Sequence, residues 1–188
     1  PSGDEGTPGS RAHMTVMTDA EVAAVAEVAR AHEKRMAAHA RSAGAVKMCL
    51  RHGVDVIYHA TLCDEEALDM LESRNARVFV APTIGITWGA YKEAPLRGVN
   101  LPDEVKRRFD NEFVKGIENM KALKKRGVRV LPGGDYGFAF NPMPRNARDM
   151  EHFVTLFGFT PMEAIVAATK YGGELMAKGA GPGESERT

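Results

Sequence analysis

Residues 35–61, RMAAHARSAGAVKMCLRHGVDVIYHAT, contain the pattern that decides the fold. Two short apolar runs, 35–40 and 54–60, stand on either side of a segment whose apolar residues follow helical spacing. The second run is rich in β-branched residues, and Gly53 before it stands where a helix would end. The stretch therefore predicts a strand, a helix and a second strand that runs parallel to the first.

A histidine lies near the end of each predicted strand: His39 in the first and His59 in the second. Because the carboxyl ends of parallel strands meet at one edge of a sheet, we expect the two imidazoles to lie near each other. Neutral imidazole is the commonest metal ligand among side chains, so the pair is a candidate metal site. A single histidine at a strand end is more often a polar group that meets water, and that alternative stays open for each.

The rest of the sequence repeats the alternation of short apolar runs and amphipathic segments. Further strands are predicted at 76–81 and 128–131, and helices after Thr18, at 64–74, 103–126 and 147–157, and after Thr160. Thr18 and Thr160 each precede a glutamate by three residues, which is the pattern of a capping box. The sequence predicts an α/β domain of parallel strands over residues 18–176, with a loop at 1–17 and a flexible tail at 177–188.

Composition argues against several classes of function. The 188 residues include 25 basic and 25 acidic side chains, so no net field points to nucleic acid or to an anionic membrane. No apolar run approaches the length of a membrane span, and no secretory signal segment begins the sequence. Cys49 and Cys63 lack the spacing of a zinc site and fit reduced thiols, so a cytoplasmic location is predicted.

Asp135 adds a third polar group to the candidate site. It follows the last predicted strand after two glycines, which let the backbone turn and leave the carboxylate at the same edge of the sheet. Ligands of parallel α/β proteins bind at that edge, where a carboxylate can ligate a metal or accept a proton from metal-bound water. The alternative is a turn-forming aspartate with no further role.

Residues 83–102 contain several glycines and prolines and are predicted to form a long irregular loop. A loop of this length in a compact domain usually carries function, as a lid or as the wall of a pocket. The alternative is a surface excursion with Trp88 packed beneath it.

Six segments, in this order, resemble the amidohydrolase superfamily, and most closely its imidazolonepropionase-like and prolidase-like branch. They are MAAHA (36–40), GVDVIYH (53–59), DEEA (64–67), VFVAPT (78–83), VLPGGD (130–135) and TPMEA (160–164) with AAT (167–169). The resemblance extends over residues 18–176. It implies a TIM-type (β/α)8 barrel, of which this chain would hold strands five to eight, the C-terminal half.

The same resemblance implies a metal-dependent hydrolase of an amide or other C–N bond in a small molecule or dipeptide-like substrate. His39 and His59 would be ligands of a divalent metal, zinc, from the fifth and sixth strands. Asp135 would bind metal from the eighth strand and handle the proton of the attacking hydroxide. Five residues would flank the substrate: Tyr58, Thr83, Trp88, Asn141 and Arg145.

Some parts of the family pattern are not in this sequence. It has no His-x-His pair, which the first strand would carry, and the fourth-strand lysine would lie just before Pro1. The sandwich domain that follows the barrel in the family is also missing. We therefore expect a fragment that is inactive alone, whose partner is the N-terminal half of the barrel or a second copy of the chain. Two alternatives stay open: a self-standing half-barrel that dimerises as a non-catalytic binding module, and a small hydrolase that uses only His39, His59 and Asp135.

Overall fold

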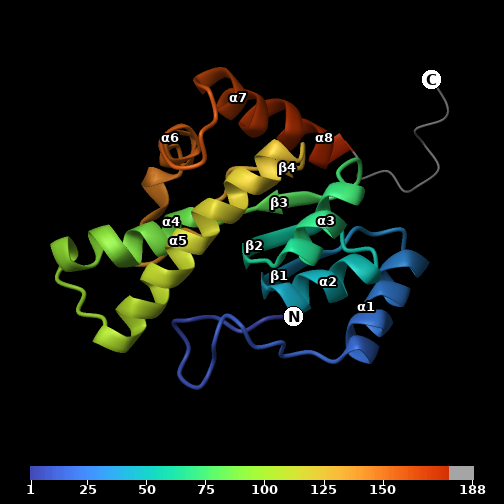
Figure 1. The fold of residues 1–188 in the computed structure, drawn as a ribbon, viewed down its shortest axis with the longest axis horizontal. Coiled ribbons are helices and arrows are strands. Elements are labelled where there is room, and N and C mark those ends of the chain that lie inside the picture. Colours follow the sequence, from blue (N-terminus) through green and yellow to red (C-terminus); the bar gives the residue numbers. More distant parts are fainter. Residues whose placement is uncertain (178–188) are drawn as a thin grey trace.

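The structure is a computed structural model that describes residues 1–177. Its centre is one sheet of four parallel strands in the order β1-β2-β3-β4, so that strands consecutive in the sequence are paired (Figure 1). The strands are β1 (Ala37–Ser42), β2 (Val56–Leu62), β3 (Phe79–Ala81) and β4 (Arg129–Val130). This arrangement confirms the predicted α/β architecture, in which parallel strands alternate with helices.

Helices precede the sheet, connect its strands and follow the last strand. They are α1 (Asp19–Ala31), α2 (Ala43–Arg51), α3 (Glu65–Ser73), α4 (Ile84–Trp88), α5 (Asp103–Lys125), α6 (Arg148–Thr155), α7 (Pro161–Val166) and α8 (Gly172–Ala177). Both predicted capping boxes are present. The hydroxyls of Thr18 and Thr160 each accept a hydrogen bond from the backbone N–H of the glutamate three residues later, and the side chain of that glutamate accepts one from the threonine backbone N–H. In Figure 1, α2, α3 and α5 lie in front of the sheet.

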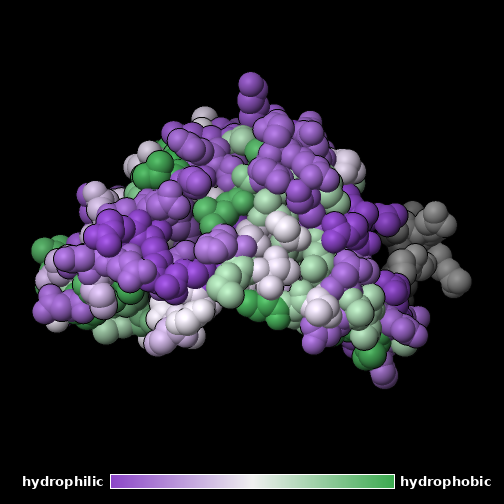
Figure 2. Space-filling view, turned by 60° about the horizontal axis from the view of Figure 1, so that its bottom comes forward, coloured by the Kyte–Doolittle hydropathy of each residue, from purple (hydrophilic) through white to green (hydrophobic). Residues whose placement is uncertain are grey.

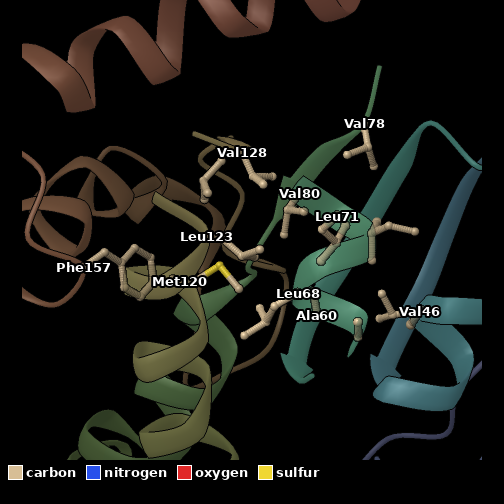
Figure 3. Packing of buried hydrophobic residues seen from close by; sticks show 14 of the residues in the cluster. Val46, Ala60, Leu68, Leu71, Val78, Val80, Met120, Leu123, Val128 and Phe157 are labelled. Atoms are coloured by element: carbon tan, nitrogen blue, oxygen red, sulfur yellow. The ribbon is translucent and has the colours of Figure 1, made fainter. Parts of the chain in front are cut away.

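The main core lies between one face of the sheet and these helices. Ile57, Val80 and Val130 occupy one register row across β2, β3 and β4, and all three are fully buried in this core. The helices contribute Val46, Leu68, Leu71, Met120 and Leu123 to it (Figure 3). Burial of each large aliphatic side chain stabilises the fold by about 1.5–3 kcal/mol, so this layer holds the helices on the strands.

The other face of the sheet carries a smaller apolar cluster. Alternate strand residues point to opposite faces, so Phe79 and Ala81 lie on this side while Val80 lies in the main core. Leu131 completes the cluster, and Tyr171 and Leu175 pack against it from the C-terminal helices. This second face borders the cavity described below.

The two strands that carry the histidines continue two residues further than the sequence predicts. β1 ends at Ser42 and β2 at Leu62, where residues 40 and 60 were expected to be last. Ser42 ends its strand and also caps α2, because its hydroxyl accepts a hydrogen bond from the Ala45 amide at 3.2 Å. His39 and His59 consequently both lie inside their strands, and their predicted position at the strand ends is wrong.

The predicted irregular loop at residues 83–102 is also wrong in part. This segment contains α4, a π-helical turn at Gly89–Glu93 and a 3-10 turn at Pro95–Arg97. A Cβ at Gly85 would lie 2.6 Å from the Gly134 carbonyl oxygen, so glycine lets α4 approach the loop after β4. Residues 84–90 are therefore largely buried and lie close to that loop, whereas Tyr91 and Leu96 are exposed.

The two ends of the described chain behave differently. Residues 1–17 contain no helix or strand of the sheet, and this segment is docked on β1: the Ser2 amide donates to the His39 carbonyl at 3.2 Å. At the other end, a π-helical turn at Ala167–Tyr171 leads from α7 into α8. The predicted flexible tail lies, from residue 178 on, outside the described residues.

Among residues 1–177, no helix combines the length and apolar character needed to cross a bilayer. Hydrophilic residues cover much of the face shown in Figure 2, and hydrophobic residues appear there in smaller, separate patches.

Candidate metal centre

The pairing of β1 and β2 is irregular at the histidines. His39 lies opposite Tyr58, Ala40 lies opposite His59, and the register shifts between Ala40 and Ser42. His59 has a φ of 78° and Ala60 a φ of 51°, a conformation that costs an L-residue about 1–2 kcal/mol. Irregular pairing of this kind redirects side chains that a regular strand would point elsewhere.

The effect is visible in what Tyr58 and His59 contact. Consecutive residues of a regular strand point to opposite faces of a sheet, yet both of these line the same cavity. His59 would otherwise face the main core, as Ile57 does. The left-handed backbone at His59 thus brings its imidazole to the side on which His39 lies.

The two imidazoles are in contact, as the sequence predicts. His39 Nδ1 and His59 Nε2 are 3.0 Å apart, and the rings meet edge to face with centroids 4.4 Å apart. His59 is buried and His39 is half-buried. The pair is thus shielded from water on most sides and open toward the cavity.

The outer nitrogen of each ring has its own partner, and these partners set the tautomers. His39 Nε2 lies 3.1 Å from the Gly3 carbonyl oxygen, which can only accept, so Nε2 carries the proton. The Thr83 hydroxyl contacts His59 Nδ1 and donates its own proton to the Pro82 carbonyl at 2.7 Å, so Nδ1 of His59 is the donor there. In the neutral rings, the two nitrogens that face each other therefore both present lone pairs.

Both rings are held in the neutral form. Burial lowers the pKa of His39, and the Arg41 charge adds to this lowering, although the Gly3 hydrogen bond opposes it. Burial is also the main cause that holds the pKa of His59 well below its usual range, with Arg41 and His39 as further causes. Two converging lone pairs that carry no proton repel each other, and a bound cation removes that repulsion. The donor set therefore fits a divalent metal that accepts imidazole nitrogen.

A cavity of about 410 Å³ opens in front of the histidine pair. Its lining includes the two histidines, Tyr58, Thr83 and Asp135, together with apolar residues of the second sheet face and of α8. Asp135 has a φ of 54° and is exposed. In residues 1–177, no three His, Cys, Asp or Glu side chains are close enough to form a complete metal site, so Asp135 shares the cavity without joining the pair.

Strained backbone is concentrated around this cavity. Five non-glycine residues in the described chain have a positive φ, and His59, Thr83 and Asp135 are three of them. All three also line the cavity. Strained conformations persist where the surroundings hold them, and they cluster at functional sites.

The remaining predicted residues divide into two groups. Tyr58 and Thr83 lie at the cavity, whereas Trp88, Asn141 and Arg145 are not in its lining. Trp88 packs in the core, with its ring 4.9 Å from the ring of His152. Arg145 is paired with Glu93 at 2.7 Å.

Asn141 acts on the backbone that carries Asp135. Its side-chain amide donates to the carbonyls of Gly134 and Asp135, at 2.7 and 2.9 Å. It therefore supports the loop of Asp135 from outside the cavity.

Sequence reasoning missed two contributors. Gly3 acts through a backbone carbonyl, which leaves no signature in the sequence. Arg41 lies two residues after His39, and its charge influences the pKa of His59. A charged residue this close to a candidate ligand is a signal that the sequence does contain.

No protein-family model matches this sequence, and no curated protein sequence matches it either. Several solved structures do resemble the fold. A prolidase in complex with N-methylphosphonate-L-proline has a TM-score of 0.80 and 24% identity, with 94% of this chain and 41% of that chain covered. An A. niger ochratoxinase has a TM-score of 0.78 and 19% identity, with 96% and 38% covered. A Xaa-Pro dipeptidase with methionine bound in its active site has a TM-score of 0.72 and 24% identity, with 86% and 38% covered.

The structural neighbours are thus amidohydrolase- and prolidase-like proteins, and this chain spans about two fifths of their length. At identities of 19–24% in these three, the similarity establishes a shared fold.

Proposed function

We propose that this chain is part of a metal-dependent hydrolase that cleaves an amide or another C–N bond in a small, dipeptide-like substrate. The observation that carries the proposal is the pair of imidazole nitrogens, His39 Nδ1 and His59 Nε2, that lie 3.0 Å apart in the lining of a cavity. The names of the fold neighbours, a prolidase and a Xaa-Pro dipeptidase, support the substrate class.

In this proposal His39 Nδ1 and His59 Nε2 hold a divalent metal, with zinc as the ion that suits imidazole. When bound, such a metal lowers the pKa of its water and polarises a carbonyl group. Gly3 and Thr83 fix the tautomers of the two ligands through their outer nitrogens. Asp135 lines the same cavity, where its carboxylate would bind the metal or act as a proton acceptor.

Two ligands fall short of the three that catalytic zinc sites usually take from a protein. We therefore propose that the active enzyme is larger than this chain, and that the four strands are strands five to eight of a TIM-type barrel. The sequential strand order and the two-fifths coverage of the fold neighbours support this. The remaining strands would come from another part of the protein or from a second copy of the chain.

Zinc titration tests the metal site directly. Isothermal titration with Zn²⁺ should show one site in the wild type, and His39→Gln or His59→Gln should weaken it at least tenfold. His32→Gln is the matched control, because His32 lies exposed at the end of α1 and should leave the affinity unchanged. Absence of zinc binding by the wild type, or equal binding by all three variants, would refute the metal site.

Activity and oligomeric state separate the proposal from a non-catalytic half-barrel. The zinc-loaded chain, alone and mixed with the remaining barrel segment, is assayed with Xaa-Pro dipeptides and N-acyl amino acids. Hydrolysis that is lost in His39→Gln supports the proposed hydrolase. A symmetric dimer in light scattering that binds no metal and hydrolyses none of these substrates supports the binding module instead.

A further inference from the structure

A buried ion pair lies directly beyond the two histidines. Arg41 on β1 is 2% exposed and Glu112 on α5 is 1% exposed, and the Arg41 guanidinium donates to Glu112 Oε1. The same carboxylate oxygen accepts the hydroxyl proton of Thr61, on β2, at 2.7 Å. One oxygen of a helix side chain therefore connects the two histidine-bearing strands.

Three residues of one face of α5 contact Thr61. Glu112 binds its hydroxyl group, and Asn119 donates to its carbonyl oxygen at 2.8 Å. Gly116 lies between them, and a Cβ there would be 3.1 Å from Thr61 Cγ2. Positions 112, 116 and 119 follow helical spacing, so this face of α5 is built to hold Thr61.

This contact lies at the strained part of the sheet. Arg41 and Thr61 each follow a candidate ligand by two residues, and the positive φ angles of His59 and Ala60 fall between ligand and contact. A strained backbone persists only where surrounding interactions hold it. The contacts of Thr61 with α5 begin at the residue that directly follows this strained pair.

The charges also match. The Arg41 guanidinium is a buried positive charge two residues after the candidate ligand His39. Glu112 supplies the compensating negative charge, because an unpaired buried guanidinium would be strongly unfavourable. The Glu112 carboxylate thus offsets the Arg41 charge, which would otherwise repel a cation bound by His39 and His59.

We propose that Glu112 is a positioning residue for the His39–His59 pair, which it acts on through Thr61 and Arg41. The proposal rests on the proposed metal site. Glu112 does not touch the cavity; it fixes the exit of β2 so that the redirected His59 stays opposed to His39. A role limited to stability is the competing explanation, and the test has to separate the two.

The test compares Zn²⁺ affinity with folding stability in four variants. Thr61→Val removes the hydroxyl and keeps the shape, Thr61→Ser keeps the hydroxyl, and Glu112→Gln removes the charge. Met120→Ala is the matched control: Met120 is fully buried on α5 and contacts the core, so its loss lowers stability and removes no hydrogen bond of Thr61. All affinities are measured at a temperature at which each variant is more than about 99% folded, judged from its unfolding curve.

We expect Thr61→Val and Glu112→Gln to weaken Zn²⁺ binding by about 10- to 100-fold, as removal of an outer partner of a metal ligand does. Thr61→Ser and Met120→Ala should stay within about threefold of wild type by the same reasoning. Equal affinity of Thr61→Val and wild type would overturn the proposal, and so would an equal loss in Met120→Ala. If Glu112→Gln does not fold, Thr61→Val still decides, because it keeps the Arg41–Glu112 pair.

A second measurement needs no metal and so separates this proposal from the metal site. Imidazole ¹⁵N spectra of the metal-free chain report the tautomer of each ring. The wild type should show His39 protonated at Nε2 and His59 at Nδ1, whereas Thr61→Val should show mixed tautomers for His59. Wild-type tautomers in Thr61→Val would overturn the positioning role, whether or not the wild type binds zinc.

Discussion

Replacement of Asp149 by Asn should change how the stability of this protein depends on pH. Asp149 and His152 lie one turn apart on α6, and each is only 2% exposed. Burial raises the pKa of Asp149 from 3.8 to about 6, although hydrogen bonds from Tyr136 and the Gly133 amide oppose the rise. Burial, with the Arg148 charge, lowers the pKa of His152 from 6.5 to about 4.

The two shifts have opposite effects on the free energy of unfolding. The folded state binds the Asp149 proton more tightly than the unfolded state, so this group lowers the unfolding free energy as pH rises from about 4 to about 6. The folded state binds the His152 proton more weakly, so this group raises the unfolding free energy as pH rises from about 4 to 6.5. At about 1.4 kcal/mol per pH unit, each contribution is about 3 kcal/mol, and in the wild type they nearly cancel.

Asp149→Asn leaves the His152 contribution alone. Relative to wild type, the unfolding free energy of the variant should therefore increase by about 3 kcal/mol between pH 4 and pH 6. His152→Gln is the matched control with the opposite sign and should lose about 3 kcal/mol relative to wild type over pH 4 to 6.5. Urea unfolding followed by circular dichroism at half-unit pH steps measures both differences. If the difference in unfolding free energy between Asp149→Asn and wild type does not vary with pH, the conclusion that burial raises the pKa of Asp149 is refuted.

Other substitutions test the packing that supports the site. Phe153→Ala should lower the unfolding free energy by about 3–5 kcal/mol in urea titrations, because Phe153 is fully buried between two other phenylalanine rings. Gly85→Ala should lower the melting temperature, since its Cβ would lie 2.6 Å from the Gly134 carbonyl; an unchanged melting temperature would contradict that close approach. Thr160→Ala should cost about 1 kcal/mol of stability by removing the cap of α7, and Thr160→Ser should restore it.

The sequence predicts the elements whose pattern is repeated and local. Alternating apolar runs and capping boxes identify the strands and helices, since these signals depend on a few neighbouring residues. The same pattern places His39 and His59 on neighbouring parallel strands, but their contact also needs the left-handed backbone at His59.

The errors arise where distant segments decide the conformation. Trp88 belongs to a packed helix because Gly85 allows that helix to lie on the loop after β4, a contact between residues some fifty positions apart. Likewise, Thr61, two residues after the left-handed His59, donates to Glu112 of α5, which is 51 positions away. No local propensity indicates a left-handed histidine.

The hydrogen bond between His39 and the Gly3 carbonyl has a practical consequence for anyone who purifies this protein. The ring orientation of one candidate ligand depends on Gly3, a residue 36 positions before it in the sequence. A proteolytic cut or a deletion within residues 1–17 that displaces Gly3 would free the His39 ring to flip. Preparations that differ only in this segment should then differ in zinc content.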